Sequence, residues 1–265
     1  MEQHQQHHTN VDPSGVKPVK SAARTVLILE YLAKHAESPS TLTELSAAIK
    51  APRSSTYALL RTLIDYGWIR SDHPGNLYRL NLRTLLVGES YLDADPYVRI
   101  VRPILADLSR KVTGTFNMSR MDDGRMVYLL TQESRRDSTL LPRIGRWLPA
   151  YATGSGKALL AIRGKADIPA KRPPITAKTI TDMKELTADL NATRQRGYGL
   201  EVDENNLGYS CVAVALRYQS PPQDAISCTL RTKDFTEKRQ HTIIDALMEA
   251  RDKIEKAAPL PGTWY

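Results

Sequence analysis

Cysteine and long apolar runs are nearly missing from the sequence. Its 265 residues include only two cysteines, Cys211 and Cys228. Two cysteines cannot build a disulfide framework or a zinc ribbon, so we expect a cytoplasmic protein with no structural metal. No run of about 18 apolar residues occurs, so we expect neither a membrane span nor a membrane partner. The first ten residues are polar, and we therefore expect no secretory signal.

Positive charge is in excess but unevenly placed. The net charge is +8. Residues 1–93 hold ten Lys/Arg and nine Asp/Glu, so most of the excess lies later in the chain. The overall charge is therefore a weak indication of nucleic-acid binding, although local clusters of basic residues can still neutralise phosphates.

The segment from Thr41 to Tyr66 predicts two helices joined by a tight turn. Thr41 and Glu44 form a capping-box pattern at the start of the first helix. Lys50-Ala51 break the pattern, and Pro52 suits the first position of a second helix. Gly67 suits the left-handed residue that follows a helix.

The second helix places polar and basic side chains on its outer face. An ordinary amphipathic pair with a solvated face would explain these residues, but hydroxyl and guanidinium groups are also those that reach base edges and phosphates in a major groove. A hairpin pattern follows at residues 68–80, and residues 22–34 predict a helix that packs behind the pair. This order is that of a winged helix-turn-helix, and it favours DNA binding.

The chain divides into four predicted parts. We expect a disordered arm over residues 1–20, a DNA-binding domain over 21–80, a linker helix over 81–94 and an α+β domain over 95–260. The linker helix has one apolar face, which suits dimer formation. In the second domain we expect strands at 115–119, 126–132, 139–141, 211–216 and 225–230, and helices at 98–113, 158–162, 181–196 and 236–256.

Candidate catalytic patterns are incomplete. The run Gly154-Ser155-Gly156-Lys157 lacks the earlier glycine and the following Ser or Thr of a phosphate loop. Ser155 and Lys157 match no serine–lysine pattern, and no histidine-centred triad forms, so we expect no catalytic residues and no cofactor. The loop before residue 157 instead opens onto a helix N-terminus, which favours an anion. Ser227 and Thr229 share one strand face, where they suit either a polar pocket or backbone pairing.

Several segments together resemble the IclR-type (isocitrate lyase regulator) family of bacterial transcription regulators. The resemblance is carried by SAARTVLILEYLA, TLTELSAAIKAPRSSTYALLRTLIDYGWI, LPAYATGSGKALLA, RQRGYGLEVDENNLGYSCVAVAL and AISCTL. It implies a winged helix-turn-helix domain, a dimerising linker helix and a GAF-like effector-binding domain. It further implies a repressor that binds promoter DNA as a homodimer or homotetramer and responds to a small organic acid, an aromatic acid or a derivative.

The resemblance also implies two sets of site residues. The expected DNA-binding residues are Arg24, Arg53, Ser54, Ser55, Tyr57, Arg61 and Arg79. The expected effector-binding residues are Thr153, Gly154, Ser155, Glu201, Cys211, Ser227 and Thr229.

Two positions depart from the family pattern. Ala58 stands where members usually carry an arginine, so Arg53 or Arg61 must supply more of the DNA contact. Glu201 is a longer acid than members usually carry, and a negative group in the pocket favours a neutral or donor-bearing effector. The competing interpretation is a small-molecule-binding or hydrolytic α+β protein with an incidental helical head.

Overall fold

A computed structural model describes residues 18–72, 77–134 and 144–259. The predicted strand at 139–141 and most of the predicted arm lie outside these ranges. The chain forms two compact units that divide between Tyr91 and Leu92.

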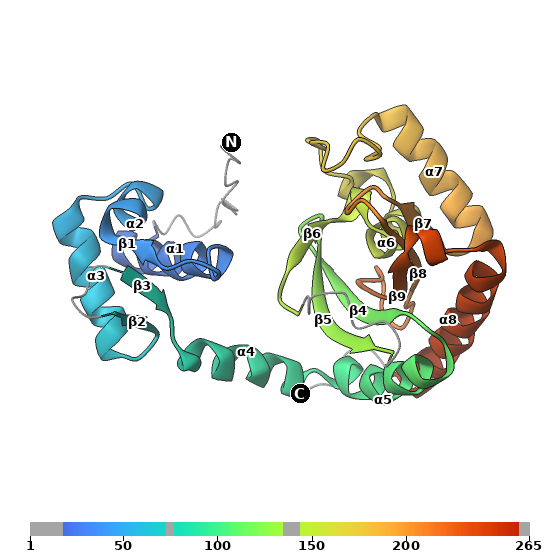
Figure 1. Cartoon of the computed structure of the whole chain (residues 1–265), viewed down its shortest axis with the longest axis horizontal. Coiled ribbons are helices and arrows are strands. Elements are labelled where there is room, and N and C mark those ends of the chain that lie inside the picture. The colour runs from blue at the N-terminus through green and yellow to red at the C-terminus, as the bar shows by residue number, and fades with distance from the viewer. Residues whose placement is uncertain (1–17, 73–76, 135–143, 260–265) are drawn as a thin grey trace. The chain divides into compact units, whose positions relative to one another are not determined.

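The first unit is a small helical domain with a three-stranded sheet (Figure 1). The antiparallel sheet has the order β1-β3-β2, and β2 with β3 makes the hairpin expected of a wing. The elements are α1 (Lys20–Lys34), β1 (Ser40–Thr41), α2 (Leu42–Ala48), α3 (Arg53–Asp65), β2 (Ile69–Ser71), β3 (Leu77–Leu80) and most of α4 (Leu82–Ala94). The last three residues of α4 belong to the second unit.

Local sequence determines where these helices begin and end. The Thr41 side chain accepts a hydrogen bond from the Glu44 amide, and Glu44 accepts one from the Thr41 amide, so the predicted capping box is confirmed. Gly67 follows α3 with φ +73°, a conformation that favours glycine. Pro52 is not the first helical residue as predicted, because its ψ of 146° is extended and α3 begins at Arg53.

The second unit is built on one six-stranded sheet in which all neighbours are antiparallel. The strand order is β6-β5-β4-β9-β8-β7, which confirms the predicted α+β class; the sequence did not predict β6 or β7. The elements are α5 (Pro96–Lys111), β4 (Thr115–Asp122), β5 (Arg125–Glu133), β6 (Trp147–Pro149), α6 (Gly154–Arg163), α7 (Met183–Arg196), β7 (Gly199–Val202), β8 (Tyr209–Ala215), β9 (Asp224–Arg231) and α8 (Glu237–Ala257).

Helices cover both faces of this sheet (Figure 1). On one face α5 and α8 pack against alternate strand residues such as Phe116, Val212 and Cys228. On the other face α6 packs against small residues, including Ala213 and Ala225. The sheet thus lies between two layers of helices, and most of the apolar side chains of this unit are buried between the sheet and these helices.

Glycine allows α6 to approach the sheet closely. A Cβ atom on Gly199 would lie 2.1 Å from the carbonyl oxygen of Gly154, and one on Gly156 would lie 2.1 Å from that of Ala150. Because no side chain fits at those distances, both glycines are required for the N-terminus of α6 to sit against β7 and the preceding turn.

A buried ionic cluster ties the start of α5 to the sheet. The guanidinium of Arg120 on β4 donates to both carboxylate oxygens of Asp224 on β9, at 2.7 Å each, and to Asp95. Asp95 in turn caps α5 by accepting from the amides of Tyr97 and Val98. The Arg120 cluster therefore holds the N-terminus of α5 against the sheet.

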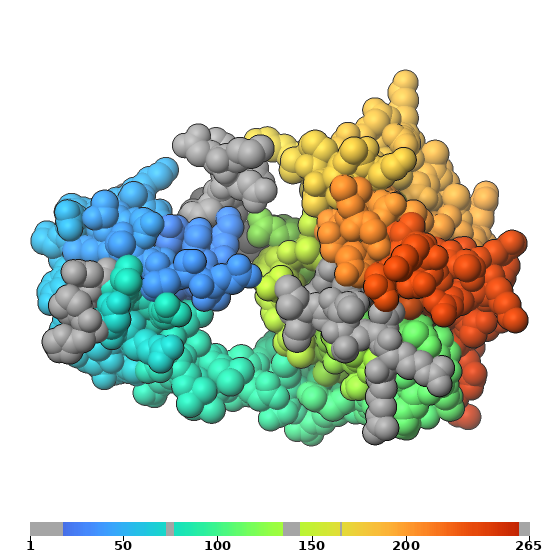
Figure 2. All heavy atoms as spheres, in the orientation of Figure 1, coloured from blue at the N-terminus to red at the C-terminus, as the bar shows by residue number. Residues whose placement is uncertain are grey.

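Helix α4, drawn as teal to green spheres in Figure 2, has large apolar side chains exposed along its length. Leu82, Leu85, Leu86 and Tyr91 are each more than half exposed, whereas Leu92 is buried in the core of the second unit. Such a run of exposed large apolar side chains is unusual for the surface of a protein.

Candidate functional site

The outer face of α3 presents the side chains expected at DNA. Thr56, Leu60 and Leu63 are buried against the rest of the first unit. This packing leaves the predicted contact residues on the opposite face in solvent: Arg53, Ser54, Ser55, Tyr57 and Arg61 are exposed, as is Arg79 on β3, while Arg24 on α1 is partly buried.

Arg61 forms an ion pair within its own helix. Its Nη2 atom lies 3.5 Å from Asp65 Oδ1, and both side chains are more than half exposed. An exposed pair of this kind contributes little stability, so its charge remains available to a phosphate or base edge.

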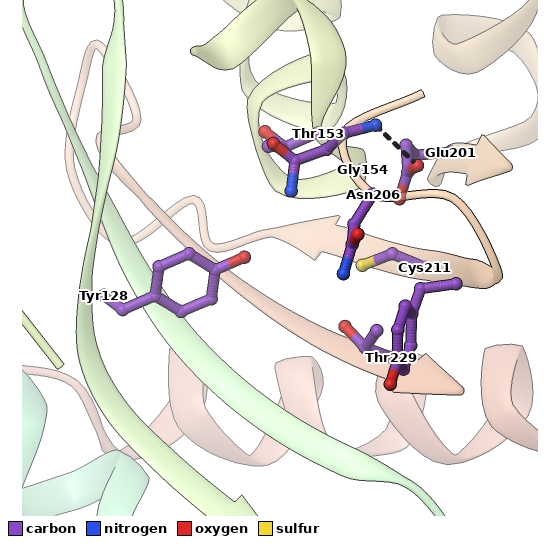
Figure 3. Close-up of a pocket in the computed structure, with 9 residues that line it drawn as sticks. Tyr128, Thr153, Gly154, Glu201, Asn206, Cys211 and Thr229 are labelled. Atoms are coloured by element: carbon purple, nitrogen blue, oxygen red, sulfur yellow. Dashed lines mark hydrogen bonds between the residues drawn. The ribbon is translucent and has the colours of Figure 1, made fainter. Parts of the chain in front are cut away.

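A small pocket lies in the second unit, at the N-terminus of α6 between β5 and the end of β7 (Figure 3). Its cavity is about 10 Å³, the space of about one water molecule. The nine lining residues are mostly polar. Among the residues that the structure describes, no lysine, arginine or histidine lines the pocket. The nine are Tyr128, Thr153, Gly154, Glu201, Asn205, Asn206, Tyr209, Cys211 and Thr229.

Three neighbouring strands bring their pocket residues into one row. Glu201 on β7 pairs with Cys211 on β8, and Cys211 pairs with Thr229 on β9. Directly opposed residues lie on the same face of a sheet, about 5 Å apart at Cβ. A carboxyl, a thiol and a hydroxyl therefore stand side by side, facing the start of α6 (Figure 3).

The start of α6 is ordered by its own cap. The Thr153 hydroxyl accepts a hydrogen bond from the Gly156 amide at 3.1 Å. The first amides of a helix have no partner within the helix, so those of the first turn give this wall of the pocket a positive partial charge.

Glu201 is a buried carboxyl with an unusual proton affinity. Its Oε1 atom accepts from the amides of Glu204, at 2.7 Å, and Asn205, at 3.1 Å. Burial raises the pKa of Glu201 to about 7, with Glu204 adding to the rise, while the two amides and Lys157 oppose it. Near neutral pH the carboxyl can therefore either donate or accept a hydrogen bond.

Lys157 is not a partner for Ser155. Its side chain is 1 % exposed, and its Nζ atom lies 2.8 Å from Asp189 Oδ2 and also pairs with Glu204. An ammonium held between two carboxylates is not a base that could activate a hydroxyl. Lys157 instead joins α6 to α7 and to the loop after β7.

The pocket gathers some of the predicted effector residues and not others. Thr153, Gly154, Glu201, Cys211 and Thr229 line it. Ser155 and Ser227 do not; both are buried, and the described residues offer no hydrogen-bond partner to either hydroxyl. Ser227 lies two residues from Thr229 on β9, between Asn117 and Ala213 of the adjacent strands.

The sequence did not identify four lining residues. Asn205 and Asn206 follow β7, a strand that was not predicted, and Tyr209 begins β8 two residues before the predicted strand. Tyr128 reaches the pocket because the register of β5 shifts by one residue opposite Met118 and Ser119. Beyond a bulge, each side chain points to the opposite face of the sheet from the one that simple alternation predicts. The position of the bulge is known only from the pairing of β5 with β4.

The buried state of Glu201 predicts a pH-dependent stability. The folded protein holds the Glu201 proton more tightly than the unfolded chain, so this group stabilises the fold at low pH and loses that contribution as pH rises through about 7. We expect the stability of the natural chain, relative to Glu201→Gln, to fall by up to about 3 kcal/mol between about pH 4.5 and pH 7. Urea unfolding of both proteins across this range measures the difference, and a constant difference would contradict the raised pKa.

Neither a metal site nor a membrane span is found in the described parts of the chain. No group of three or more His, Cys, Asp and Glu side chains there could hold a metal ion. None of the helices in these ranges is long and apolar enough to cross a membrane.

Each of the two units matches a known protein family. Residues 89–256 match the model of the bacterial transcriptional regulator IclR C-terminal domain, and residues 21–73 match the IclR helix-turn-helix domain. The transcriptional repressor IclR of Escherichia coli K12 is 30% identical over 205 residues, which cover 75% of this chain and 74% of that protein. The matched relatives are transcriptional regulators, not enzymes.

Solved structures share the fold of the whole chain. An IclR transcriptional regulator from Alicyclobacillus acidocaldarius superposes with a TM-score of 0.80 at 23% identity, covering 91% of this chain and 99% of its own. An IclR homologue from Microbacterium hydrocarbonoxydans in complex with 4-hydroxybenzoate gives a TM-score of 0.73 at 20% identity, covering 89% of this chain and 98% of its own.

Proposed function

Because the chain belongs to the IclR family of bacterial transcriptional regulators, we propose that it is a repressor whose binding to promoter DNA is controlled by a small organic effector. The proposal rests on the presence of two features in one chain. The first is the exposed polar and basic face of α3, and the second is a separate polar pocket at the start of α6. One unit supplies recognition and the other supplies a site through which a small molecule can shift the equilibrium between two states.

On the DNA side, we assign recognition to α3 and backbone contacts to the wing. Arg53 and Arg61 are the arginines of the exposed α3 face, and Ala58 between them adds no charge. Arg79 on β3 stands at the hairpin, where wings meet the phosphate backbone or minor groove. Arg24 on α1 is a candidate for a further phosphate contact, since phosphate contacts set the register of a protein on DNA.

Arg61→Ala is expected to weaken operator binding by about 1–3 kcal/mol, because a specific arginine contact contributes that much. Asp65→Ala is the matched control, since it removes the other half of the same ion pair without removing the DNA contact. Fluorescence anisotropy on labelled operator measures both. Equal losses in the two variants, or none in Arg61→Ala, would exclude Arg61 from the interface.

On the effector side, we propose an aromatic acid, a related organic acid or a derivative, with neutral derivatives preferred. Tyr128 and Tyr209 supply aromatic walls, and Thr229 and Glu201 supply polar groups. Because the cavity of about 10 Å³ holds about one water molecule, these walls must move apart to admit such a ligand. A bare carboxylate would meet the Glu201 carboxyl with no basic side chain among the described lining residues. The neighbour that binds 4-hydroxybenzoate supports an aromatic acid-like ligand in this fold, and calorimetric ranking of carboxylates above their amides would oppose the preference for neutral ligands.

The assembly we propose is a homodimer through α4, with a homotetramer as the larger form. The exposed leucines of α4 would be covered by the same helix of a second copy, as the closed symmetry of most homo-oligomers favours. Two α3 helices in one dimer would then read two half-sites on the same DNA.

The deciding experiment is a gel-shift titration on the DNA upstream of the chain's own gene. It is run at about 0.15 M salt with excess unrelated duplex, because non-specific contacts weaken steeply at that ionic strength. A discrete complex that survives the competitor supports the proposal, and sedimentation of that complex gives the number of subunits. Binding that the competitor abolishes would remove the regulatory function.

A further inference from the structure

Two arginines stand directly opposite each other on the wing. Arg70 on β2 pairs with Arg79 on β3 in the antiparallel register of the hairpin. Their neighbours along the chain, Ile69 and Tyr78, are buried, so both arginines point away from the core and are exposed. Directly opposed residues lie about 5 Å apart at Cβ, so the two guanidinium groups extend from one small area of the surface.

The two guanidinium groups have no partner among the residues that the structure describes. Neither Arg70 nor Arg79 makes a hydrogen bond or an ion pair with them. The acid on the same face, Asp72, accepts a hydrogen bond from the Leu77 amide at 3.0 Å and so belongs to the turn of the hairpin. Like charges placed directly opposite destabilise a strand pair, so the wing contains a repulsion that an anion between the arginines would remove.

A cavity lies at the arginine pair and has room for such an anion. It measures about 300 Å³, against about 10 Å³ for the pocket of the second unit. Two arginines and one aspartate give its lining a net charge of +1, and the planar N–H donors of a guanidinium match the oxygens of a phosphate. The lining residues are Arg70, Ser71, Asp72, Leu77 and Arg79.

The wing is joined to the end of α3 by main-chain hydrogen bonds. The Trp68 amide donates to the Leu63 carbonyl of α3 at 2.8 Å, and the Asn81 amide donates to the Trp68 carbonyl at 2.9 Å. The start of β2 and the end of β3 are therefore both tied to the last turn of α3. A phosphate held on the wing would lie at a fixed distance from the bases that α3 contacts, and such contacts set the register of a protein on DNA.

We propose that Arg70 and Arg79 together bind one phosphodiester group of the DNA backbone. This inference rests on the proposed DNA-binding function, and it adds Arg70, which the sequence did not indicate, to the DNA-contact residues. A base edge would occupy the N–H donors of a single arginine, as in arginine–guanine pairs. A phosphate has enough oxygens for both arginines, and its charge offsets their repulsion.

The test measures the fluorescence anisotropy of two labelled duplexes with the full-length protein. One duplex is the operator, and the other is an unrelated sequence of the same length. Arg70→Met and Arg79→Met should each weaken binding to both duplexes by about tenfold, the usual effect of losing a hydrogen bond to a charged group. If neither variant lost affinity, the proposal would be overturned.

Two further variants serve as controls. Asp72→Asn removes the acid from the cavity but keeps an oxygen for the Leu77 amide, so it should strengthen binding to both duplexes. Arg110→Met removes an exposed arginine of the second unit, which pairs with Asp107, and should bind like the natural chain. Weaker binding by Asp72→Asn would contradict an anion in this cavity.

The salt dependence of binding distinguishes one shared phosphate from two separate ones. In the double variant Arg70→Met/Arg79→Met, the slope of log K against log salt concentration should become shallower by about 0.9, the value for one phosphate. A change of about 1.8 would indicate two phosphates and overturn the shared site. A loss of affinity confined to the operator would indicate a base contact and would also overturn it.

Hydrogen exchange of the free protein tests whether the arginines have a structural role instead. Removing either arginine should slow amide exchange in residues 69–72 and 77–80, because the repulsion between the strands is gone. Faster exchange would mean that the arginines hold the hairpin together. The loss of DNA affinity would then be indirect, and the proposal would be overturned.

The two duplexes also separate this proposal from the regulatory function. If the operator complex survives competitor but the arginine variants bind like the natural chain, only the shared phosphate site is overturned. If no operator complex survives competitor, while the variants still lose affinity for the unrelated duplex, the regulatory function is overturned and the phosphate site remains.

Discussion

Arg120→Met should destabilise the second unit by about 3–5 kcal/mol, the cost of removing one partner from a buried ion pair. The Arg120 side chain is only 17 % exposed, and Asp224 is completely buried. Burial lowers the pKa of Arg120, but Asp224 and Asp95 outweigh burial, so the pKa lies above its usual range and the guanidinium stays charged. Without it, two carboxylates would remain in a core that also buries the Tyr218 hydroxyl, a donor to Asp224.

Urea denaturation followed by circular dichroism measures the effect. Arg110→Met is the matched control, because Arg110 pairs with Asp107 on the surface and should lose less than about 1 kcal/mol. Combining Arg120→Met with Asp224→Asn should recover part of the stability, since the second change removes the stranded charge. If Arg120→Met lost no more free energy of unfolding than the control, the Arg120 cluster would not contribute to the stability of the second unit.

Lys157→Met should also cost about 3–5 kcal/mol, for a similar reason at the other side of the sheet. The Lys157 ammonium is enclosed by Asp189 and Glu204, and burial already raises the pKa of Glu204. Removing the cation leaves two carboxylates close together, and one of them must take up a proton to remain buried. The loss of stability should therefore be smaller at acid pH than at neutral pH.

The matched control is Lys253→Met, which breaks an exposed i,i+4 pair with Glu249 and should change stability by less than about 0.5 kcal/mol. Thermal unfolding at two pH values distinguishes the variants. A Lys157→Met protein as stable as the control would contradict the stabilising role of the Lys157 ion pairs.

Both clusters connect the pocket strands to other parts of the second unit. Arg120 follows Ser119 on β4 and holds the residue that caps α5. Lys157 lies in the first turn of α6 and holds the loop that carries Asn205. Of the two clusters, that of Lys157 lies at the start of α6, beside the pocket.

Much of the structure of the first unit could be predicted from local sequence. A capping box, the spacing of apolar residues in α3 and a glycine after it act over four or five residues, so each can be recognised without knowing the fold. The α+β class of the second unit and several of its strands followed from the same periodicities. The short edge strands β6 and β7 did not, because three or four residues give too little alternation to be recognised.

The composition of the pocket depended on how the strands pair. Alternation along β9 placed Ser227 and Thr229 on one face, but depth along the strand, which alternation does not report, put Thr229 at the cavity and left Ser227 in the interior. Tyr128 enters the pocket through a shift in register between β4 and β5. The partners of Lys157 and Arg120 lie 25 to 104 residues away.

The sequence by itself thus determined the helix-turn-helix, the α+β class and five of the nine residues that line the pocket. The tertiary structure alone decided which polar groups converge and which are locked in ion pairs. The physical reason is range: helix caps, turns and periodicities depend on neighbours along the chain. Burial, register and charge pairing depend instead on neighbours in space, and these determine whether a carboxyl such as Glu201 keeps its proton near neutral pH.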